Sequence, residues 1–423
     1  MRRKRKLVSG LAALAAATLT LGACGGGGSA DAEDGGTAQV RVWLVGSDTP
    51  DEARQYLIDT FAEQHENAEI VIEEQVWAGL VDKLSTSLSG SDSPDVVEMG
   101  NTQAPTFTTV GAFAPLEEYY QDLGGDDLLE GFVDAGTAED TLYAVPYYAG
   151  SRLVFYNKDM VSQAPETLEE YVHLGAELKE KHSDVQGFSG IWWPGQDWRN
   201  GLPFIWAAGG EIAEQQDDGS WKGALSAPES IEGLTMIQET MLSANGAPAD
   251  ADETDPQVPW CAKKSAMLSA PGWVLGTLTD PEQGCPDMED KIGVFALPGT
   301  EPGSTAPVFL GGSNIAVSAN APHPDLALDA IRIMLSDEYQ TIMAENGLIP
   351  AKASLVDAMG DDPVAQAAAA AAQNTRIPPA TPGWANVESA RIMEDLFQSL
   401  AQGNDVAAAA AEADQRITEA LNE

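Results

Sequence analysis

Basic residues are scarce in this chain. Of its 423 residues, 22 are Lys or Arg and 66 are Asp or Glu, so the formal net charge is −44. Nucleic acids and anionic lipid head groups are poor partners for such a surface, because like charges repel. The acids are spread along the whole chain. This distribution indicates that their role is to keep the protein soluble in a salty medium. The alternative, capture of a cationic solute, requires carboxylates gathered in a cleft.

Cysteine and histidine are also rare. The four histidines stand in isolated, polar or loop contexts, so the sequence predicts no metal site. Two of the three cysteines, Cys261 and Cys285, occur without a CxxC motif and without a histidine nearby. In an exported protein such a pair is typical of one structural disulfide.

Catalytic signatures are missing as well. The sequence has no GxSxG, no HExxH and no GxxxxGK[ST] motif, and no GxGxxG spacing follows the Gly311-Gly312-Ser313 run. The sequence therefore predicts neither a cofactor nor an enzyme. A surface-anchored glycoside hydrolase stays open as an alternative, because it needs only two carboxylates about 5 to 9 Å apart and so many acids always offer a pair.

The one long apolar run covers residues 7–21, after five cations and before the sequence LGAC that ends at Cys24. This run is shorter than the roughly 20 apolar residues that span a membrane, and its ending resembles a bacterial lipoprotein signal. We expect residues 1–23 to be a lipoprotein signal peptide, Cys24 to carry lipid, and residues 24–38 to be a flexible tether. An ordinary secretory signal, in which Cys24 is incidental, is the alternative.

Strand and helix patterns alternate after the tether. Apolar runs predict strands over 40–45, 70–76 and 95–99, with helices between them. This order is typical of a parallel α/β sheet, whose ligands lie beyond the carboxyl ends of the strands. The candidate ligand contacts at those ends are Asp48, Trp77, Asn101 and Gln103.

The remaining length of about 400 residues suits two domains. Small residues at 149–151 separate a strand-like run that ends at Tyr148 from a second one over 153–156. We expect the chain to cross between domains at this point, because small residues tolerate a hinge. The segment 308–318 is a further strand pair broken by glycines, which suggests more than one crossing.

Tryptophans occur in loops rich in proline and glycine. Three of them crowd the segment 192–198, Trp273 follows a Pro-Gly pair, and so does Trp384. A flat indole matches the apolar face of a sugar ring, and nearby Asn, Asp, Arg and Gln can bond its hydroxyls. We expect about half of the ten tryptophans to fill the core and a few to line a cleft.

Six segments together resemble one known family. They are VRVWLVGSD, SPDVVEMGNTQAPTFTTVGAFAPLEEY, YAVPYYAGSRLVFYNKDM, KKSAMLSAPGW, GGSNIAVSANAPHPDLALDAIRIMLSDEYQ and TRIPPATPGW. In this order the chain is similar to the maltose- and oligosaccharide-binding lipoproteins of bacterial ABC importers, extracellular solute-binding family 1. The resemblance implies a type II periplasmic-binding-protein fold, with two α/β lobes joined by several chain crossings. The implied lobes are 39–149 with about 312–360, and 150–311 with about 361–423.

The family also implies a function and a site. The protein would capture a mono- or oligosaccharide, of the α-glucoside, disaccharide or chitin-fragment type, by lobe closure, and deliver it to the transmembrane subunits of an ABC permease. It would be a lipid-anchored monomer on the outer face of the membrane of a Gram-positive actinobacterium. A carbohydrate receptor that does not transport is a further alternative. The predicted ligand contacts are Asp48, Trp77, Asn101, Gln103, Trp198, Arg199, Asn200, Trp273, Asn314 and Trp384.

Within that set the family assigns roles. Trp273 and Trp384 match positions whose aromatic rings stack on sugar. Asn101 and Asp48 match polar positions that bond hydroxyls. Arg199 and Asn200 fall near a third contact region of the family. The aromatic residue usual in that region is not at its usual position here, and we expect Trp198 to take its place.

Overall fold

A sheet of ten strands runs through the described part of the chain, in the order β2-β1-β3-β12-β6-β10-β7, with β11 and β13 added to β6 and β14 to β12. The computed structural model describes residues 37–423, apart from residues 47, 78, 91, 362, 373 and 380. The predicted signal peptide, Cys24 and most of the predicted tether lie outside the described residues.

The strands of this sheet are β1 (Ala38–Val45), β2 (Ala68–Gln75), β3 (Val96–Gly100), β6 (Val145–Asn157), β7 (Ser189–Trp192), β10 (Ser265–Pro271), β11 (Ile292–Phe295), β12 (Val308–Val317), β13 (Ile349–Pro350) and β14 (Thr375–Arg376). Two small hairpins are formed by β4 (Thr137–Ala138) with β5 (Thr141–Leu142), and by β8 (Ala213–Gln215) with β9 (Trp221–Gly223). The α-helices are α1 (Asp51–Gln64), α2 (Leu80–Leu88), α3 (Ala104–Thr108), α4 (Glu130–Ala135), α5 (Leu168–Lys181), α6 (Leu202–Ala207), α7 (Pro228–Ser243), α8 (Gln257–Cys261), α9 (Val274–Thr279), α10 (Pro324–Met334), α11 (Asp337–Glu345), α12 (Pro363–Ala372), α13 (Trp384–Ser389), α14 (Ile392–Ala401) and α15 (Val406–Leu421).

The first three sheet strands follow the pattern that the sequence predicted. β1 pairs in parallel with β2 on one side and with β3 on the other. The next strand, β12, runs antiparallel to β3, so the whole sheet is mixed rather than purely parallel. Asp48, Trp77 and Asn101 therefore all follow the carboxyl ends of parallel neighbours, as expected.

The strand β6 is the longest in the sheet and changes partners midway. Up to Ser151 it pairs with β12 and β13, and from Arg152 onward it pairs with β10 and β11. The prediction of two runs separated by a break was wrong, because β6 continues without interruption where these partners hold it on either side of residue 151. The change of partner nevertheless falls at the crossing that the small residues indicated. The segment predicted as a second broken pair is likewise one strand, β12, with a register irregularity between Ser313 and Asn314.

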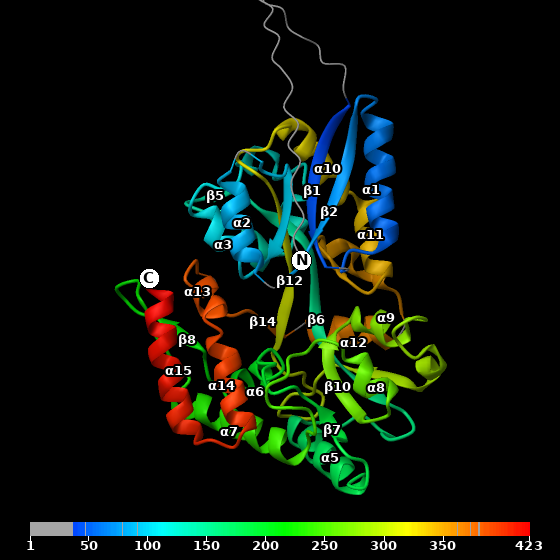
Figure 1. Ribbon diagram of the computed structural model, residues 1–423, viewed down its shortest axis with the longest axis vertical. Helices are drawn as coiled ribbons and strands as arrows, with labels where there is room; N and C mark the ends of the chain where they lie inside the picture. The colour runs from blue at the N-terminus through cyan, green and yellow to red at the C-terminus, as the bar shows by residue number, and fades with distance from the viewer. Residues whose placement is uncertain are drawn as a thin grey trace, which may run out of the picture. The chain divides into compact units, whose positions relative to one another are not determined.

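Three hydrophobic clusters lie along this sheet. One packs α1, α10 and α11 against β1 and the start of β6, and a second, around Leu84 and Phe107, includes residues of α2 and α3. The third and largest includes the end of β6, β10 and the helices α5, α7, α14 and α15. Figure 1 shows β6 and β12 running between the part with β1, β2 and α1 and the part with β10, β7 and α5. Trp273 packs against clusters of both parts, which places it at their junction.

Helices form where the sequence has amphipathic or alanine-rich runs. α2 buries Leu80, Leu84 and Leu88, which recur every four residues on one helix face. The alanine-rich helix α15 begins at the N-cap Asp405, whose side chain accepts a hydrogen bond from the backbone N–H of Ala408. Strong local propensity and a cap explain why these helices were predictable.

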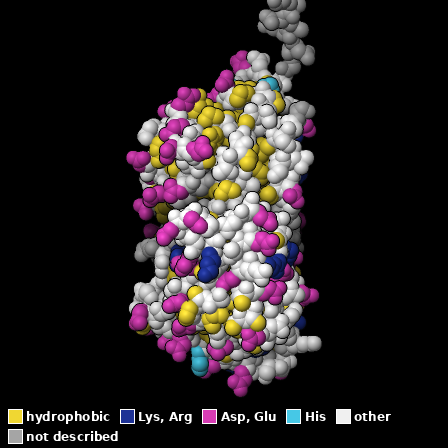
Figure 2. Space-filling view, turned by 90° about the vertical axis from the view of Figure 1, so that its left-hand side faces the viewer, with side chains coloured by type: hydrophobic (Ala, Val, Ile, Leu, Met, Phe, Trp, Pro, Cys, Tyr) yellow, Lys and Arg dark blue, Asp and Glu magenta, His cyan; other side chains and the backbone are white. Residues whose placement is uncertain are grey.

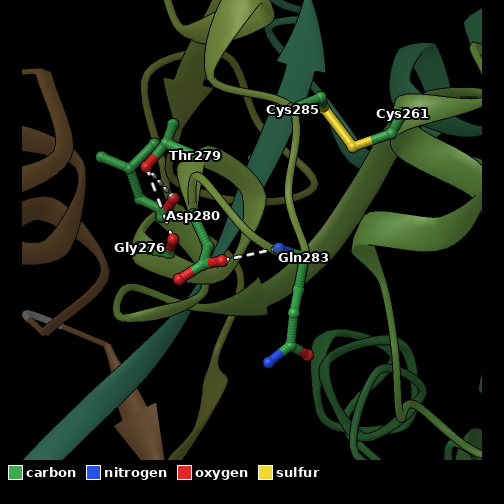
Figure 3. The surroundings of a disulfide bond; sticks show 7 residues. Cys261, Gly276, Thr279, Asp280, Gln283 and Cys285 are labelled. Carbon is green, nitrogen blue, oxygen red and sulfur yellow. Dashed lines mark hydrogen bonds between the residues drawn. A yellow bond between two sulfur atoms is a disulfide. The ribbon is translucent and has the colours of Figure 1, made fainter.

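Cys261 and Cys285 form the predicted disulfide, with their Cα atoms 5.5 Å apart. The bond joins the end of α8 to the loop after α9, as Figure 3 shows. In the same loop Asp280 accepts a hydrogen bond from the backbone N–H of Gln283. The disulfide therefore braces the segment that carries Asp280 and Gln283.

Acidic side chains are spread over the molecule. Figure 2 shows Asp and Glu over the upper and lower parts of the visible face, with no single acidic patch on it. This distribution matches the spacing of acids in the sequence and favours solubility as the role of most of them. Among the described residues no helix is long and apolar enough to cross a membrane.

Candidate functional site

A cavity of about 340 Å³ lies beside the point where β6 changes partners. It shares Asp48, Trp77, Glu253, Thr254, Pro271 and Trp273 with a more open hollow of about 740 Å³, so the two hollows adjoin. The shared lining comes from the loops after β1 and β2, from the loop between α7 and α8, and from the junction of β10 with α9. Together the two spaces have room for a small ligand such as a sugar of a few rings.

Aromatic rings line this space. Trp273 precedes α9 and lies edge-on to Tyr148, with ring centroids 6.2 Å apart. Its indole rests directly on Gly150 of β6, where a Cβ atom would lie 2.1 Å from the ring atom Cζ3. Trp77 lies at the end of β2 with 40% of its surface exposed. These two indoles line the space with flat apolar rings, whereas Trp384, the other expected stacking residue, does not line it.

A chain of hydrogen bonds connects Asp48 to the interior. Trp77 Nε1 donates to Asp48 Oδ2 at 3.3 Å, and the hydroxyl of Tyr148 lies 3.2 Å from the same oxygen. The Tyr148 hydroxyl also lies 3.1 Å from Glu98 Oε1, so its single proton serves one carboxylate at a time. Glu98 additionally accepts hydrogen bonds from Ser313 Oγ and from the backbone N–H of Val45.

Burial perturbs both carboxyl groups of this chain. It raises the pKa of Glu98 from 4.5 to about 7, against the opposing effect of the hydrogen bonds from Ser313 and Val45. Burial also raises the pKa of Asp48, although the hydrogen bonds from Tyr148 and Trp77 oppose the rise. Glu98, which lies behind Tyr148 and not in the cavity wall, is therefore only partly ionised near neutral pH.

On the other side of the cavity the buried Arg152 holds two carboxylates. Its guanidinium lies 2.6 Å from Glu253 and 3.4 Å from Asp197, and it donates through Nε to Asn200 Oδ1 at 2.8 Å. Burial raises the pKa of Asp197 to about 7, and the nearby charge of Glu253 adds to the rise. Burial also acts to raise the pKa of Glu253, but the attraction of Arg152 and Arg199 outweighs it and leaves that pKa lowered.

The structure separates the predicted contacts into two groups. Six of them line the cavity or the adjoining hollow: Asp48, Trp77, Asn101, Gln103, Arg199 and Trp273. Four are buried and are not among the lining residues: Trp198, Asn200, Asn314 and Trp384.

The buried predicted residues have partners within the protein. Asn200 bonds Arg152 and Asp197, and Asn314 donates through Nδ2 to the carbonyl of Phe132 at 2.8 Å. Trp384 packs edge-on against Trp198, with ring centroids 6.0 Å apart. Three of these side chains contact lining residues from behind: Asn200 contacts Arg152, Trp198 contacts Arg199 and Trp384 contacts Glu388.

Sequence reasoning missed several lining residues, among them Tyr148, Arg152, Glu253, Phe309 and Glu388. Two features of the sequence could have pointed to this region, because each is a charged residue within an apolar strand. Arg152 is the one cation in the apolar run of β6, and Glu98, which lies behind Tyr148, is an acid within the buried strand β3. Glu253 and Glu388 gave no such signal, because the chain has 66 acids. Among the described residues no group of His, Cys, Asp or Glu is placed to hold a metal ion.

Comparison with known proteins identifies the relatives of this chain. Residues 46–341 match the family model of bacterial extracellular solute-binding proteins. The chain is 31% identical over 399 residues to the diacetylchitobiose binding protein DasA of Streptomyces coelicolor, and the match covers 91% of each chain.

Solved structures show the same fold. The GacH receptor of Streptomyces glaucescens aligns with a TM-score of 0.77 at 19% identity, covering 92% of this chain and 99% of the other. The sugar-binding protein MalE of Xanthomonas citri aligns with a TM-score of 0.75 at 23% identity, covering 91% and 97%. These likenesses confirm the predicted α/β type II binding-protein fold. The chain therefore belongs to the bacterial extracellular solute-binding proteins of family 1, as its sequence segments indicated.

Proposed function

We propose that this protein binds an oligosaccharide in the cavity beside β6 and delivers it to an ABC permease without chemical change. The observation that carries the proposal is the pairing of two indole faces, Trp77 and Trp273, with polar groups that can bond hydroxyls. Aromatic faces desolvate the apolar side of a sugar ring, and directed hydrogen bonds select among its hydroxyls.

Among sugars, a chitin-derived disaccharide is our first candidate, and α-glucosides are the second. The support is the name of DasA, a diacetylchitobiose binding protein that is similar over almost the whole chain. The amide and hydroxyl groups of such a disaccharide suit the mixed polar lining of Asp48, Asn101 and Gln103.

Binding would occur by closure of two lobes, proposed as 39–149 with about 312–360 and 150–311 with about 361–423. The ligand would shift a population of open molecules toward the closed form, because only the closed form contacts it from both sides. The proposal includes lipidation of Cys24, which would hold a monomer at the outer face of the cell membrane within reach of the permease.

The test is a thermal-shift screen of the purified protein with diacetylchitobiose, cellobiose, α-glucosides and sugar alcohols, followed by calorimetry on the best ligand. We expect Trp273→Ala to weaken that affinity at least about tenfold, which corresponds to about 1.4 kcal/mol. Trp221→Ala is the matched control, because Trp221 is also partly buried but lies outside both hollows. Equal affinity of the wild type and Trp273→Ala would contradict the assignment.

The same sugars separate binding from hydrolysis. A glycoside hydrolase would convert them to shorter products, whereas the proposed binding protein returns them unchanged after long incubation. Product formation that depends on Asp48 or Glu253 would replace the proposal with an enzymatic one.

A further inference from the structure

Glu388 connects two segments that lie far apart in the sequence. It lies on α13, while Thr102 lies in the turn between β3 and α3. Thr102 Oγ1 donates a hydrogen bond to Glu388 Oε1 at 3.2 Å. A second contact joins the same segments, because Thr106 Oγ1 donates to the carbonyl of Pro382 at 3.4 Å.

The two segments belong to different hydrophobic clusters. The helix α3, directly after Thr102, contributes Ala104 and Phe107 to the cluster that packs α2. The helix α13 contributes Trp384 and Val387 to the large cluster that contains α14 and α15. The bond between Thr102 and Glu388 therefore joins the two parts of the molecule that we propose to move as lobes.

Trp384 fixes the position of the Glu388 carboxylate. Its indole is fully buried, and Nε1 donates to Glu388 Oε1 at 3.0 Å. Trp198 supports the ring from behind, and the guanidinium of Arg199 covers Trp198 at 4.5 Å from its ring. Trp384 therefore contributes to the site by donating its N–H group to Glu388 from a fixed, buried position. In this conformation its ring face is not available for stacking on a ligand.

The position of Glu388 suits contact with a ligand. Glu388 lines the cavity, and the bonds from Thr102 and Trp384 both end on Oε1. The second oxygen, Oε2, is therefore the one that neither donor uses. A carboxylate is a strong acceptor for hydroxyl or amide N–H donors, because hydrogen bonds to an ionised acceptor are short and strong.

We propose that Glu388 is a ligand-binding residue that bonds a donor group of the sugar through Oε2 while Thr102 holds Oε1 across the two lobes. Trp384 is its positioning residue. The inference rests on the proposed sugar-binding function and adds a direct coupling to it. Ligand binding and the interlobe bond use the same carboxylate, so each orders this side chain for the other.

Two near-isosteric variants and one smaller aromatic variant test the proposal on the full chain. Glu388→Gln removes the charge, Thr102→Val removes the hydroxyl, and Trp384→Phe removes the N–H while it keeps an aromatic ring in the core. Glu419→Gln is the matched control, because it removes one carboxylate from an exposed position on α15 that lies outside both hollows. Thermal melts of each variant establish that it is folded before any affinity is compared.

Calorimetry uses diacetylchitobiose, or the tightest ligand of the screen above if another sugar binds better. We expect Glu388→Gln and Trp384→Phe to raise Kd about tenfold and Thr102→Val to raise it severalfold. Because Thr102 acts through Glu388, adding Thr102→Val to Glu388→Ala, which removes both carboxylate oxygens, should not weaken binding further. Unchanged Kd in folded Glu388→Gln, or fully additive losses in the double variant, would overturn the proposal.

Small-angle X-ray scattering without ligand gives a readout that does not depend on sugar binding. Loss of the Thr102 bond should shift the lobes toward open forms and increase the radius of gyration of Thr102→Val relative to the wild type and Glu419→Gln, whereas Glu388→Gln keeps an amide oxygen that can still accept this bond. If no sugar binds the wild type, the proposed function fails while this comparison still decides the interlobe bond. An identical radius of gyration in all variants would refute the coupling.

Discussion

A methyl group added at Gly150 would collide with the indole of Trp273. The Cβ atom would lie 2.1 Å from Cζ3 and 3.1 Å from two further ring atoms, all of Trp273. The backbone itself accepts alanine, because Gly150 is not among the described glycines with positive φ. The ring must therefore move by more than about 1 Å before ordinary contact is restored.

Overpacking of this kind costs about 1 to 3 kcal/mol in folding free energy. Because Trp273 lines both hollows, we expect its displacement to weaken ligand affinity about tenfold as well. Chemical unfolding measures the first effect, and calorimetry with the best sugar of the screen measures the second.

The control is Gly150→Ala in a Trp273→Ala background. The three atoms nearest to the added methyl group belong to the indole, so its removal should make Gly150→Ala almost neutral. A double-mutant cycle isolates this coupling. The reasoning is refuted if Gly150→Ala leaves stability and affinity unchanged, or if it costs the same with and without the indole.

Three further predictions concern stability. The folded protein keeps the Glu98 proton at pH values where the unfolded chain has lost it, because burial raises this pKa from 4.5 to about 7. The free energy of unfolding should therefore fall by about 3 kcal/mol from this group as the pH rises through that range, and Glu98→Gln should lessen the slope seen in urea unfolding at several pH values. Replacing Cys261 and Cys285 together by Ser should cost about 3 kcal/mol on the chain-entropy model for their separation of 24 residues, and an unchanged Tm would argue against it. Raising the salt concentration from about 0.01 M to about 1 M should raise Tm, because screening relieves repulsion among the 66 acids, whereas a constant Tm would count against this view.

Local sequence patterns predicted the elements but not all of their connections. The helices between the first strands formed as expected, since the apolar residues of one face, such as Leu80, Leu84 and Leu88 of α2, are close together in the sequence. The strand β6 was predicted as two runs because Gly150 and its small neighbours have weak strand propensity. Pairing with four other strands overrides that local weakness, and such partners lie far away in the sequence.

The site was predictable where family segments carried it, as at Trp273 and Asp48. A tryptophan after Pro-Gly could face a cleft or the core, and local sequence does not decide between them. Trp384 was expected at the ligand because it matches a stacking position of the family, whereas its ring is fully buried. Its contribution to binding stays a prediction, and the proposed contribution is now to hold the Glu388 carboxylate in place. That carboxylate could not be chosen from 66 acids, because its significance depends on Thr102, 286 positions away.

The lining of the cavity extends from Asp48 to Glu388 along the chain, and this spacing bears on the order of folding. Contacts between such distant residues close long loops, which slows folding. The first strands and helices can form early, but the cavity is complete only when α13 docks. We therefore expect a chain that ends before α13 to retain much of its sheet and yet lack a finished binding site. Ligand binding would then require that synthesis has reached the C-terminal helices.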